Sequence, residues 1–197
     1  MDLDVKLKDG YYFQIDNDTD PMDPRDYDFQ DQWCKMVCFH TKYSLGDKHD
    51  YDKNDYDSWS ELADEIENRE NPICMLPVYI YDHSGIRIST EPFGCKWDSG
   101  QVGFIYATTK TIDGMGMSPD KNEDWNDFQD RLIERLKADI RIYDLYVSGQ
   151  VYCLQIFDKD DEVEESISGF FGSNWSDNGV MDYIKPYMEE AETVGDL

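Results

Sequence analysis

Charged and apolar residues occupy different stretches of this chain. Three stretches are close to neutral, with net charges of +2, 0 and 0: residues 32–46, 71–112 and 145–157. They hold many of the β-branched and aromatic residues that strands favour. Four stretches are acidic, with net charges of −7, −7, −4 and −10: residues 1–31, 47–70, 113–144 and 158–197. We therefore expect a neutral sheet with acidic loops, helices and chain ends laid over it.

Apolar spacing and end signals predict three helices. The string Ser58-Trp59-Ser60-Glu61 has capping-box spacing and begins the first. The longest is expected over residues 123–147 and is ended by Gly149. A last helix begins after Asp177 and is bent or restarted at Pro186. The apolar positions are Trp59, Leu62, Ala63 and Ile66 in the first helix, and Trp125, Phe128, Leu132, Leu136, Ile140 and Tyr143 in the longest.

The neutral stretches predict the strands, most of them in hairpins. Asp82-His83-Ser84-Gly85 is a tight turn between two strands, and the acidic residues 158–162 turn between two more. The Pro- and Asp-rich residues 16–31 are expected as a loop. The expected strands are residues 3–15 (one or two strands), 33–40, 76–81, 86–90, 101–109, 151–157 and 165–171. This order predicts an α+β fold, an antiparallel β-sheet with two or three helices packed on it and a strongly acidic surface.

Length and composition indicate one folded domain. An apolar fraction of 40%, with 14 Tyr, 9 Phe and 5 Trp, supports a packed core and excludes a disordered acidic tail. The expected domain, 1–197, has a partly looped acidic segment 1–31, an α+β core 32–175 and an acidic C-terminal helix 176–197. No long apolar run or signal peptide is seen, and five cysteines have irregular spacing, so we expect a cytoplasmic protein with free thiols.

The net charge of −26 exceeds what folding or solubility requires. It comes from 44 acids and 18 bases, and repulsion at this charge weakens the compact state. Asp supplies 31 of the 44 acids, and its short side chain holds the charge close to the backbone. We therefore expect a positioned charge pattern shown to a basic partner. A solvated face and adaptation to high salt are the alternatives; an excess of Lys over Arg, twelve to six, disfavours the second.

Three histidines near turns provide an alternative, a hydrolytic or metal site. Their spacing from neighbouring acids matches no metal-binding motif, so capping of turns is the favoured interpretation and no metal or cofactor is expected. The candidates for this site are His40, His49, His83, Cys38, Asp47, Asp50 and Asp82.

Three loops offer weaker candidates. Residues 16–20 and 158–162 resemble the start of a calcium loop but lack the glycine required at its sixth position. Residues 94–101 carry Cys95, Asp98 and a serine between two glycines, which suits a nucleophile, but no base is assignable. A structural loop with Trp97 as a hydrophobic plug is the favoured interpretation, and no catalytic residue is expected.

Several strings of the neutral stretches are distinctive, among them Trp97-Asp98-Ser99-Gly100-Gln101-Val102-Gly103-Phe104-Ile105-Tyr106. Others lie within residues 36–40, 43–50, 76–86 and 143–152. These strings resemble a family of small, uncharacterised proteins from phages and other bacterial mobile elements. The resemblance implies a mobile-element context and carries no catalytic residues. By composition the chain is also similar to antirestriction and anti-CRISPR proteins that mimic DNA, a class analogy without shared motifs.

The expected function is inhibition of a host nucleic-acid-targeting defence system, as an anti-CRISPR or antirestriction protein. The acidic surface would act as a DNA or RNA mimic that occupies the basic channel of a protein or ribonucleoprotein effector. The protein is expected not to be an enzyme and not to bind nucleic acid or membrane itself, and homodimerisation is left open. The expected contacts are Asp47, Asp50, Asp52, Asp55, Asp57, Glu61, Asp64, Glu65, Asp158, Asp160, Asp161, Glu162, Glu164 and Glu165, with the 16–31 loop third in density.

Two other classes remain as alternatives. One is a small hydrolase or ligand-binding protein built on the loops of His40, His49, His83, Cys95 and Asp98, with the acids as a solubilising surface. The other is a structural or assembly protein of the mobile element.

Overall fold

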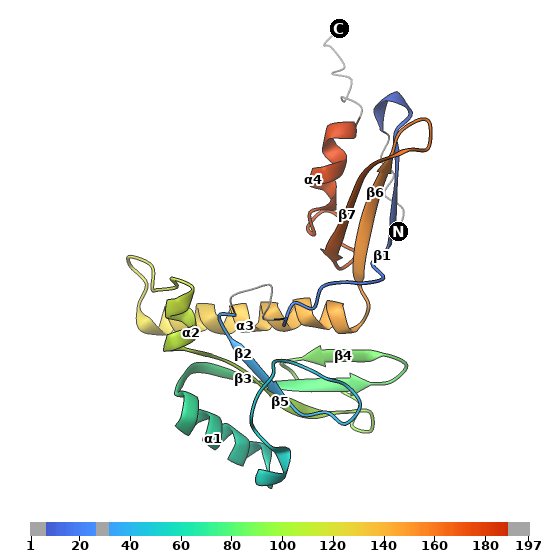
Figure 1. The fold of residues 1–197 in the computed structure, drawn as a ribbon. Coiled ribbons are helices and arrows are strands. Elements are labelled where there is room, and N and C mark those ends of the chain that lie inside the picture. Colours follow the sequence, from blue (N-terminus) through green and yellow to red (C-terminus); the bar gives the residue numbers. More distant parts are fainter. Residues whose placement is uncertain (1–6, 27–31, 189–197) are drawn as a thin grey trace. The chain divides into compact units, whose positions relative to one another are not determined.

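The computed structural model describes residues 7–26 and 32–188 and divides the chain into two compact units (Figure 1). We call residues 23–148 the central unit. Residues 1–22 and 149–197 form the terminal unit, which joins the two ends of the chain. Each unit has a sheet of its own.

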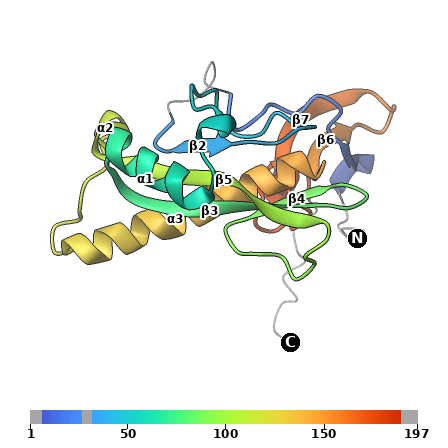
Figure 2. The ribbon, with the colours of Figure 1, turned by 90° about the horizontal axis from the view of Figure 1, so that it is seen from below.

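The central unit is a four-stranded antiparallel sheet between helices. Its strand order is β2-β5-β3-β4. The helix α3 covers one face of this sheet and α1 covers the other, and Figure 2 shows α1 lying over β5 and β3. The elements are β2 (Lys35–Cys38), the 3-10 turn η2 (Lys53–Asp55), α1 (Trp59–Glu70), β3 (Pro72–Asp82), β4 (Ile86–Ser89), β5 (Ser99–Thr108), α2 (Thr109–Gly114) and α3 (Trp125–Val147).

The central strand β5 is buried on both faces, which explains its nearly continuous apolar sequence. Ile105 packs into the α3 side of the sheet, whereas Phe104 and Tyr106 pack into the α1 side. Gly103 allows β2 to approach, because a Cβ at this position would lie 1.9 Å from the carbonyl oxygen of Val37. Both layers of the core therefore depend on this strand.

The long helix α3 closes its side of the sheet with the predicted apolar stripe. Phe128, Leu132, Leu136, Ile140 and Tyr143 are at most 2% exposed. The Asp124 side chain caps the helix by accepting from the N–H groups of Asn126 and Asp127. Trp125 is 54% exposed, so its predicted place on the apolar face is wrong: it occupies the first position of the helix, and the buried stripe begins at Phe128.

Asp144 joins α3 to the edge strand β4. Its carboxylate accepts a bidentate pair of bonds from Arg87, the shortest 2.7 Å, and a 2.8 Å bond from the backbone N–H of Ile88. An edge strand presents unpaired backbone groups that invite pairing with other chains. Asp144 satisfies one of these groups, and the Arg87 fork lies beside it.

The terminal unit is a three-stranded antiparallel sheet with the order β1-β6-β7. Leu154, Ile156, Phe170, Val180 and Ile184 form its core, because α4 packs on the sheet. The elements are the 3-10 turn η1 (Lys8–Gly10), β1 (Tyr12–Asn17), β6 (Val151–Phe157), β7 (Val163–Phe171), α4 (Val180–Ile184) and the 3-10 turn η3 (Lys185–Tyr187).

The predicted α+β class with antiparallel pairing is confirmed, with two sheets where one was expected. The strand expected over residues 33–40 covers only Lys35–Cys38, and α2 had no predicted counterpart. The last helix ends in the 3-10 turn that contains Pro186, as its predicted bend required. Expectations for residues 3–6, 27–31 and 189–197 lie outside the described residues.

The single domain stays a prediction, since compactness does not report whether the two units unfold together. The units meet in sequence at residues 22/23 and 148/149, rather than at the expected internal boundaries 31/32 and 175/176. The pairing of β1 with β6 accounts for this division, because it binds residues 12–17 to the C-terminal part of the chain. No helix of the described residues is both long enough and apolar enough to cross a membrane.

Candidate acidic interface

The acidic stretch before and within α1 is built on a defined helix start. The Glu61 backbone N–H donates to Ser58 Oγ at 3.2 Å, which confirms the predicted cap. The Glu61 carboxylate turns back and accepts from the Asp57 backbone N–H at 2.7 Å. Leu62 and Ile66 hold the helix on the sheet, and they are at most 1% exposed. Glu61, Asp64 and Glu67 are thereby fixed on the exposed side of an anchored helix.

Most of the predicted acids in this stretch reach solvent. Among the described residues the only ion pair they make is between Asp50 and Arg69, at 3.0 Å, and it lowers the pKa of Asp50. Glu65 is half-buried, and the others are exposed. We call this set the α1 acidic segment: Asp50, Asp52, Asp55, Asp57, Glu61, Asp64 and Glu65.

The linear charge density of α1 is close to that of a nucleic acid strand. The helix has five acids in its 12 residues: Glu61, Asp64, Glu65, Glu67 and Glu70. Twelve residues span about 18 Å, since a helix rises about 1.5 Å per residue. This gives about one carboxylate per 3.6 Å of helix axis, compared with about one phosphate per 3.4 Å of duplex axis for one DNA strand. The helix contains a single base, Arg69, which pairs with Asp50 outside it.

Asp47 lies outside this surface, contrary to the expectation that it contacts a partner. Its side chain is 3% exposed and pairs with Arg25, whose side chain is also 3% exposed, at 2.6 Å. Its carboxylate also accepts from the backbone N–H of Met36 at 2.6 Å. A carboxylate enclosed in this way is structural, because it cannot reach another protein without unfolding the loop around it.

The acids of the β6–β7 turn lie in the terminal unit and are partly engaged in its structure. Asp158 accepts from the backbone N–H groups of Asp160 and Glu162, both at 2.9 Å. The hydroxyl of Tyr12 donates to Asp161 at 2.9 Å, which raises the pKa of Tyr12. We call this set the β6–β7 acidic turn: Asp158, Asp160, Asp161, Glu162, Glu164 and Glu165.

Glu165 belongs to the sheet more than to the turn. It is half-buried and accepts a 2.8 Å bond from the hydroxyl of Tyr187, which raises the pKa of Tyr187 to about 12. Asp160, Glu162 and Glu164 are exposed, and Asp160 lies 4.0 Å from the Lys159 ammonium. The β6–β7 acidic turn thus offers fewer unengaged carboxylates than the α1 acidic segment.

The described part of the 16–31 loop is held by local turns. Asp18 accepts from the N–H of Asp20 at 3.1 Å, and Asp23 accepts from the N–H of Arg25 at 2.7 Å. Burial raises the pKa of Asp23. Residues 27–31 lie outside the described residues.

The histidines of the alternative site serve separate turns. The ring nitrogen Nδ1 of His40 accepts from the N–H groups of Lys42 and Tyr43, at 3.2 and 3.3 Å. His49 donates from Nε2 to the carbonyl oxygen of Cys38 at 3.1 Å, in the tautomer that this contact requires. Burial raises the pKa of Cys38 to about 12, so its thiol stays protonated. Residues 7–26 and 32–188 contain no group of three or more metal-ligating side chains arranged to hold an ion.

The neutral loop does bring three of its candidates together. Asp98 Oδ2 lies 3.3 Å from His83 Nδ1 and accepts from the Cys95 thiol at 3.7 Å. The Ser99 hydroxyl donates to the carbonyl oxygen of Cys95. The carboxylate lies between imidazole and thiol, whereas a nucleophilic cysteine needs the imidazole next to it. Trp97 is 95% exposed, so its predicted role as a hydrophobic plug is wrong.

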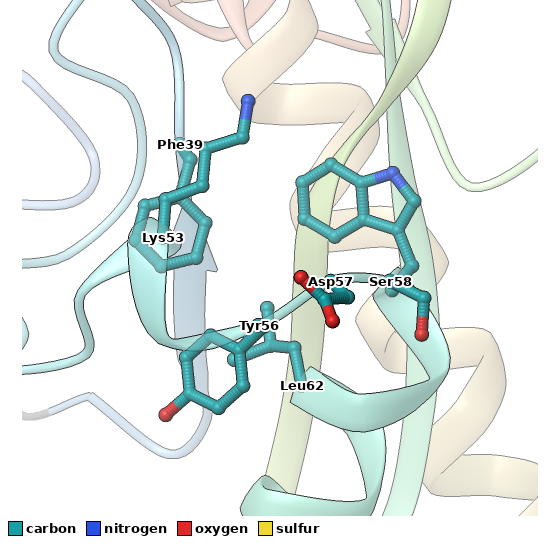
Figure 3. A pocket seen from close by; sticks show the side chains of 7 residues that line it. Phe39, Lys53, Tyr56, Asp57, Ser58 and Leu62 are labelled. Atoms are coloured by element: carbon teal, nitrogen blue, oxygen red, sulfur yellow. The ribbon is translucent and has the colours of Figure 1, made fainter.

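A cavity of about 170 Å³, which no separate sequence signal predicted, lies beside the start of α1. Figure 3 shows the Phe39 ring and Lys53 on one side of the view and the Asp57 carboxylate near Tyr56, and the Trp59 ring lies 6.4 Å from that of Phe39 between centroids. The apolar spacing of α1 predicts Trp59 on the helix face that packs on the core, and its contact with Phe104 confirms this. The residues that line the cavity are Phe39, Lys53, Tyr56, Asp57, Ser58, Trp59 and Leu62.

Comparison with known proteins yields no relative. No protein-family model, no curated protein and no solved structure matches this chain.

Proposed function

We propose that this protein inhibits a nucleic-acid-targeting defence effector by occupying its basic nucleic-acid-binding channel. The α1 acidic segment supplies the principal contact, and the β6–β7 acidic turn supplies a second one on the terminal unit. The mobile-element resemblance of the neutral strands fits an inhibitor of host defence. The protein would thus act as an anti-CRISPR or antirestriction protein in the bacterial cytoplasm.

The charge density of α1 is the observation that carries this proposal. Five carboxylates along about 18 Å of a rigid helix give an axial charge density close to that of one nucleic acid strand. Leu62 and Ile66 anchor that helix, so the charges are held in place before any partner arrives. Preformed charge complementarity gives fast and specific association.

The same pattern works against the stability of the helix, which supports a role in binding. Glu61 and Glu65 are four residues apart, and Asp64, Glu67 and Glu70 follow at intervals of three. Like charges at these spacings destabilise a helix by about 0.2–0.5 kcal/mol per pair. Glu67 and Glu70 also lie at the C-terminal end, where the helix dipole disfavours anions. A sequence selected for folding alone gains nothing from this arrangement.

The enzymatic alternative has less geometric support. Of its five residues, the structure brings together His83, Asp98 and Cys95, and Asp98 occupies the middle place. The Cys95 thiol donates to the Asp98 carboxylate at 3.7 Å, and the His83 imidazole contacts the same carboxylate rather than the thiol.

A cleavage assay tests the proposal. A panel of purified CRISPR ribonucleoprotein effectors and restriction endonucleases is incubated with the protein, and cleavage of duplex DNA is measured as NaCl rises from 50 to 300 mM. We expect inhibition of at least one enzyme, competition by excess duplex DNA, and loss of inhibition at the higher salt because ion pairs with the channel are screened.

Charge reversal separates a positioned pattern from overall charge. The triple variant Asp55→Lys, Asp64→Lys, Glu65→Lys should abolish inhibition, because three carboxylates become repulsive. The matched control, Glu91→Lys, Asp113→Lys, Asp130→Lys, makes the same change of net charge at exposed acids of the central unit outside the α1 acidic segment. Inhibition that survives the first variant, or that DNA does not compete with, would refute nucleic-acid mimicry.

A further inference from the structure

The cavity beside α1 combines aromatic walls with an acidic surround. Its lining includes the aromatic rings of Phe39, Tyr56 and Trp59 together with Leu62, and Figure 3 shows the Asp57 carboxylate among the lining side chains. We propose that this cavity receives an arginine side chain of the basic partner. The identity of the partner rests on the proposed function, whereas recognition of a guanidinium follows from the cavity and is tested separately.

The aromatic rings are held by packing and are placed to share one cation. The ring centroids of Phe39 and Trp59 are 6.4 Å apart, with 32° between the planes. Trp59 is fixed edge-on to Phe104 at 6.3 Å, and Phe39 is fixed edge-on to His49 at 5.1 Å. A cation is attracted within about 6 Å of a ring centroid, and Trp is the strongest partner. A group at the opening therefore lies within reach of both rings.

The surrounding charge selects a cation over an anion. Asp55, Asp57, Glu61 and Asp64 are exposed acids at and around the start of α1, and one base, Lys53, lines the cavity. A nucleotide would stack on the same rings, but its phosphates would meet these carboxylates. A guanidinium stacks on aromatic faces and donates to carboxylates at once, and it sheds water more readily than an ammonium does.

The volume fits one side chain. Cavities that hold whole small-molecule ligands measure roughly 300–1,000 Å³. This one measures about 170 Å³. An anchor residue that fills a small, partly desolvated pocket is the usual form of a binding hot spot, and Arg is among the commonest anchors.

Lys53 gives the proposal a gain-of-binding test. Its ammonium points away from the Asp57 carboxylate in Figure 3, so the carboxylate is open to an incoming donor. A positive charge at the opening repels a guanidinium, and its removal should strengthen binding. Lys110, exposed on α2 and absent from the cavity lining, provides a lysine for the matched control.

The experiment titrates the full chain with two tripeptides and follows the indole N–H signals by NMR. The peptides are Gly-Arg-Gly and Gly-citrulline-Gly, which have nearly the same shape and differ in charge. We expect a saturable shift of the Trp59 signal with the arginine peptide alone, while Trp97 and Trp125 stay unmoved. A shift of equal size with citrulline, or none with arginine, overturns the proposal.

Two variants sharpen the result. Lys53→Ala should raise the affinity for the arginine peptide about fivefold, and Lys110→Ala should leave this affinity unchanged. Trp59→Leu, which keeps an apolar side chain against Phe104, should weaken binding of the arginine peptide about fivefold, as measured by calorimetry. Trp125→Leu should leave this affinity unchanged. Unchanged or weaker binding by Lys53→Ala contradicts the proposal even if Trp59→Leu fails to fold.

These outcomes are distinguishable from failure of the proposed function. Arginine binding at Trp59 without inhibition of any effector would support the cavity assignment and refute nucleic-acid mimicry. Salt-sensitive inhibition that is the same for wild type, Lys53→Ala and Trp59→Leu removes the cavity assignment and leaves the mimicry.

Discussion

At the scale of single residues, tertiary contacts give Asp47 a structural role inside the central unit instead of a place on its surface. Asp47 Oδ1 accepts from Arg25 Nε at 2.8 Å. Asp47 Oδ2 accepts from Arg25 Nη2 at 2.6 Å and from the backbone N–H of Met36 at 2.6 Å. Arg25 also donates to the carbonyl oxygen of Cys34 at 3.2 Å. This network fastens the loops around residues 25 and 47 to β2, so the pair is a structural element of the central unit.

We expect Asp47→Ala to lower the free energy of unfolding by about 3–5 kcal/mol, because it leaves the Arg25 guanidinium buried without its partner. Urea unfolding followed by fluorescence measures the change. Asp113→Ala, at an exposed acid of the same unit, should stay within about 0.5 kcal/mol. Replacing both partners, Arg25→Met with Asp47→Leu, should cost less than Asp47→Ala alone. Equal stability of Asp47→Ala and Asp113→Ala would show that the pair does not support the fold.

The sequence could not separate Asp47 from its exposed neighbours, and the reason is physical. Arg25 lies 22 residues before Asp47, in a loop whose path depends on the finished sheet. Nothing local marks either residue as buried. The reverse error occurs at Trp97, where an aromatic side chain expected to fill space is 95% exposed. Burial of a single side chain is decided by contacts that are distant along the chain.

At the scale of elements, sequence signals worked where the determining contacts were local. The capping string at Ser58 placed the start of α1, and apolar spacing placed α3. Two tight turns placed the hairpins β3–β4 and β6–β7. The pairing of β1 with β6 escaped prediction because it joins residues about as far apart as Tyr12 and Phe157. That pairing adds a third strand to the β6–β7 hairpin, which forms a sheet separate from β2-β5-β3-β4.

Two substitutions on α1 should change stability in opposite directions although each removes one negative charge. Glu67→Gln should stabilise the protein by about 0.5 kcal/mol, because Glu67 lies near the C-terminal end of the helix dipole and three residues from both Asp64 and Glu70. Glu61→Gln should destabilise it by a similar amount, because Glu61 lies in the first turn and accepts from the Asp57 N–H.

Thermal and urea unfolding of these two variants at low ionic strength measures the difference. Raising the salt should shrink both effects, since the charges are exposed. A stabilisation by Glu61→Gln as large as that by Glu67→Gln would mean that total charge, rather than position on α1, controls the helix.

At the scale of the whole molecule, the negative charge is not confined to one unit. The terminal unit, residues 1–22 and 149–197, has a net charge of −14, and the central unit, residues 23–148, has −12. Repulsion among acids therefore acts within each unit, and the negative charge per residue is higher in the smaller, terminal unit. The chain thus carries its charge on two compact units, and repulsion within each one opposes its compact state.

We expect the melting temperature of the full chain to rise with salt and then level off. The screening length falls from about 30 Å at 0.01 M to about 8 Å at 0.15 M, so repulsion among the acids weakens over this range. A gain of about 1 kcal/mol would raise the melting temperature by roughly 2–4 °C for a chain of this size. Calorimetry at 0.01, 0.05, 0.15 and 0.5 M NaCl measures it, with choline chloride as a control for binding of a particular cation. A rise that continues into molar salt would indicate adaptation to high salt instead, and a fall would show that attractive ion pairs outweigh the −26 charge.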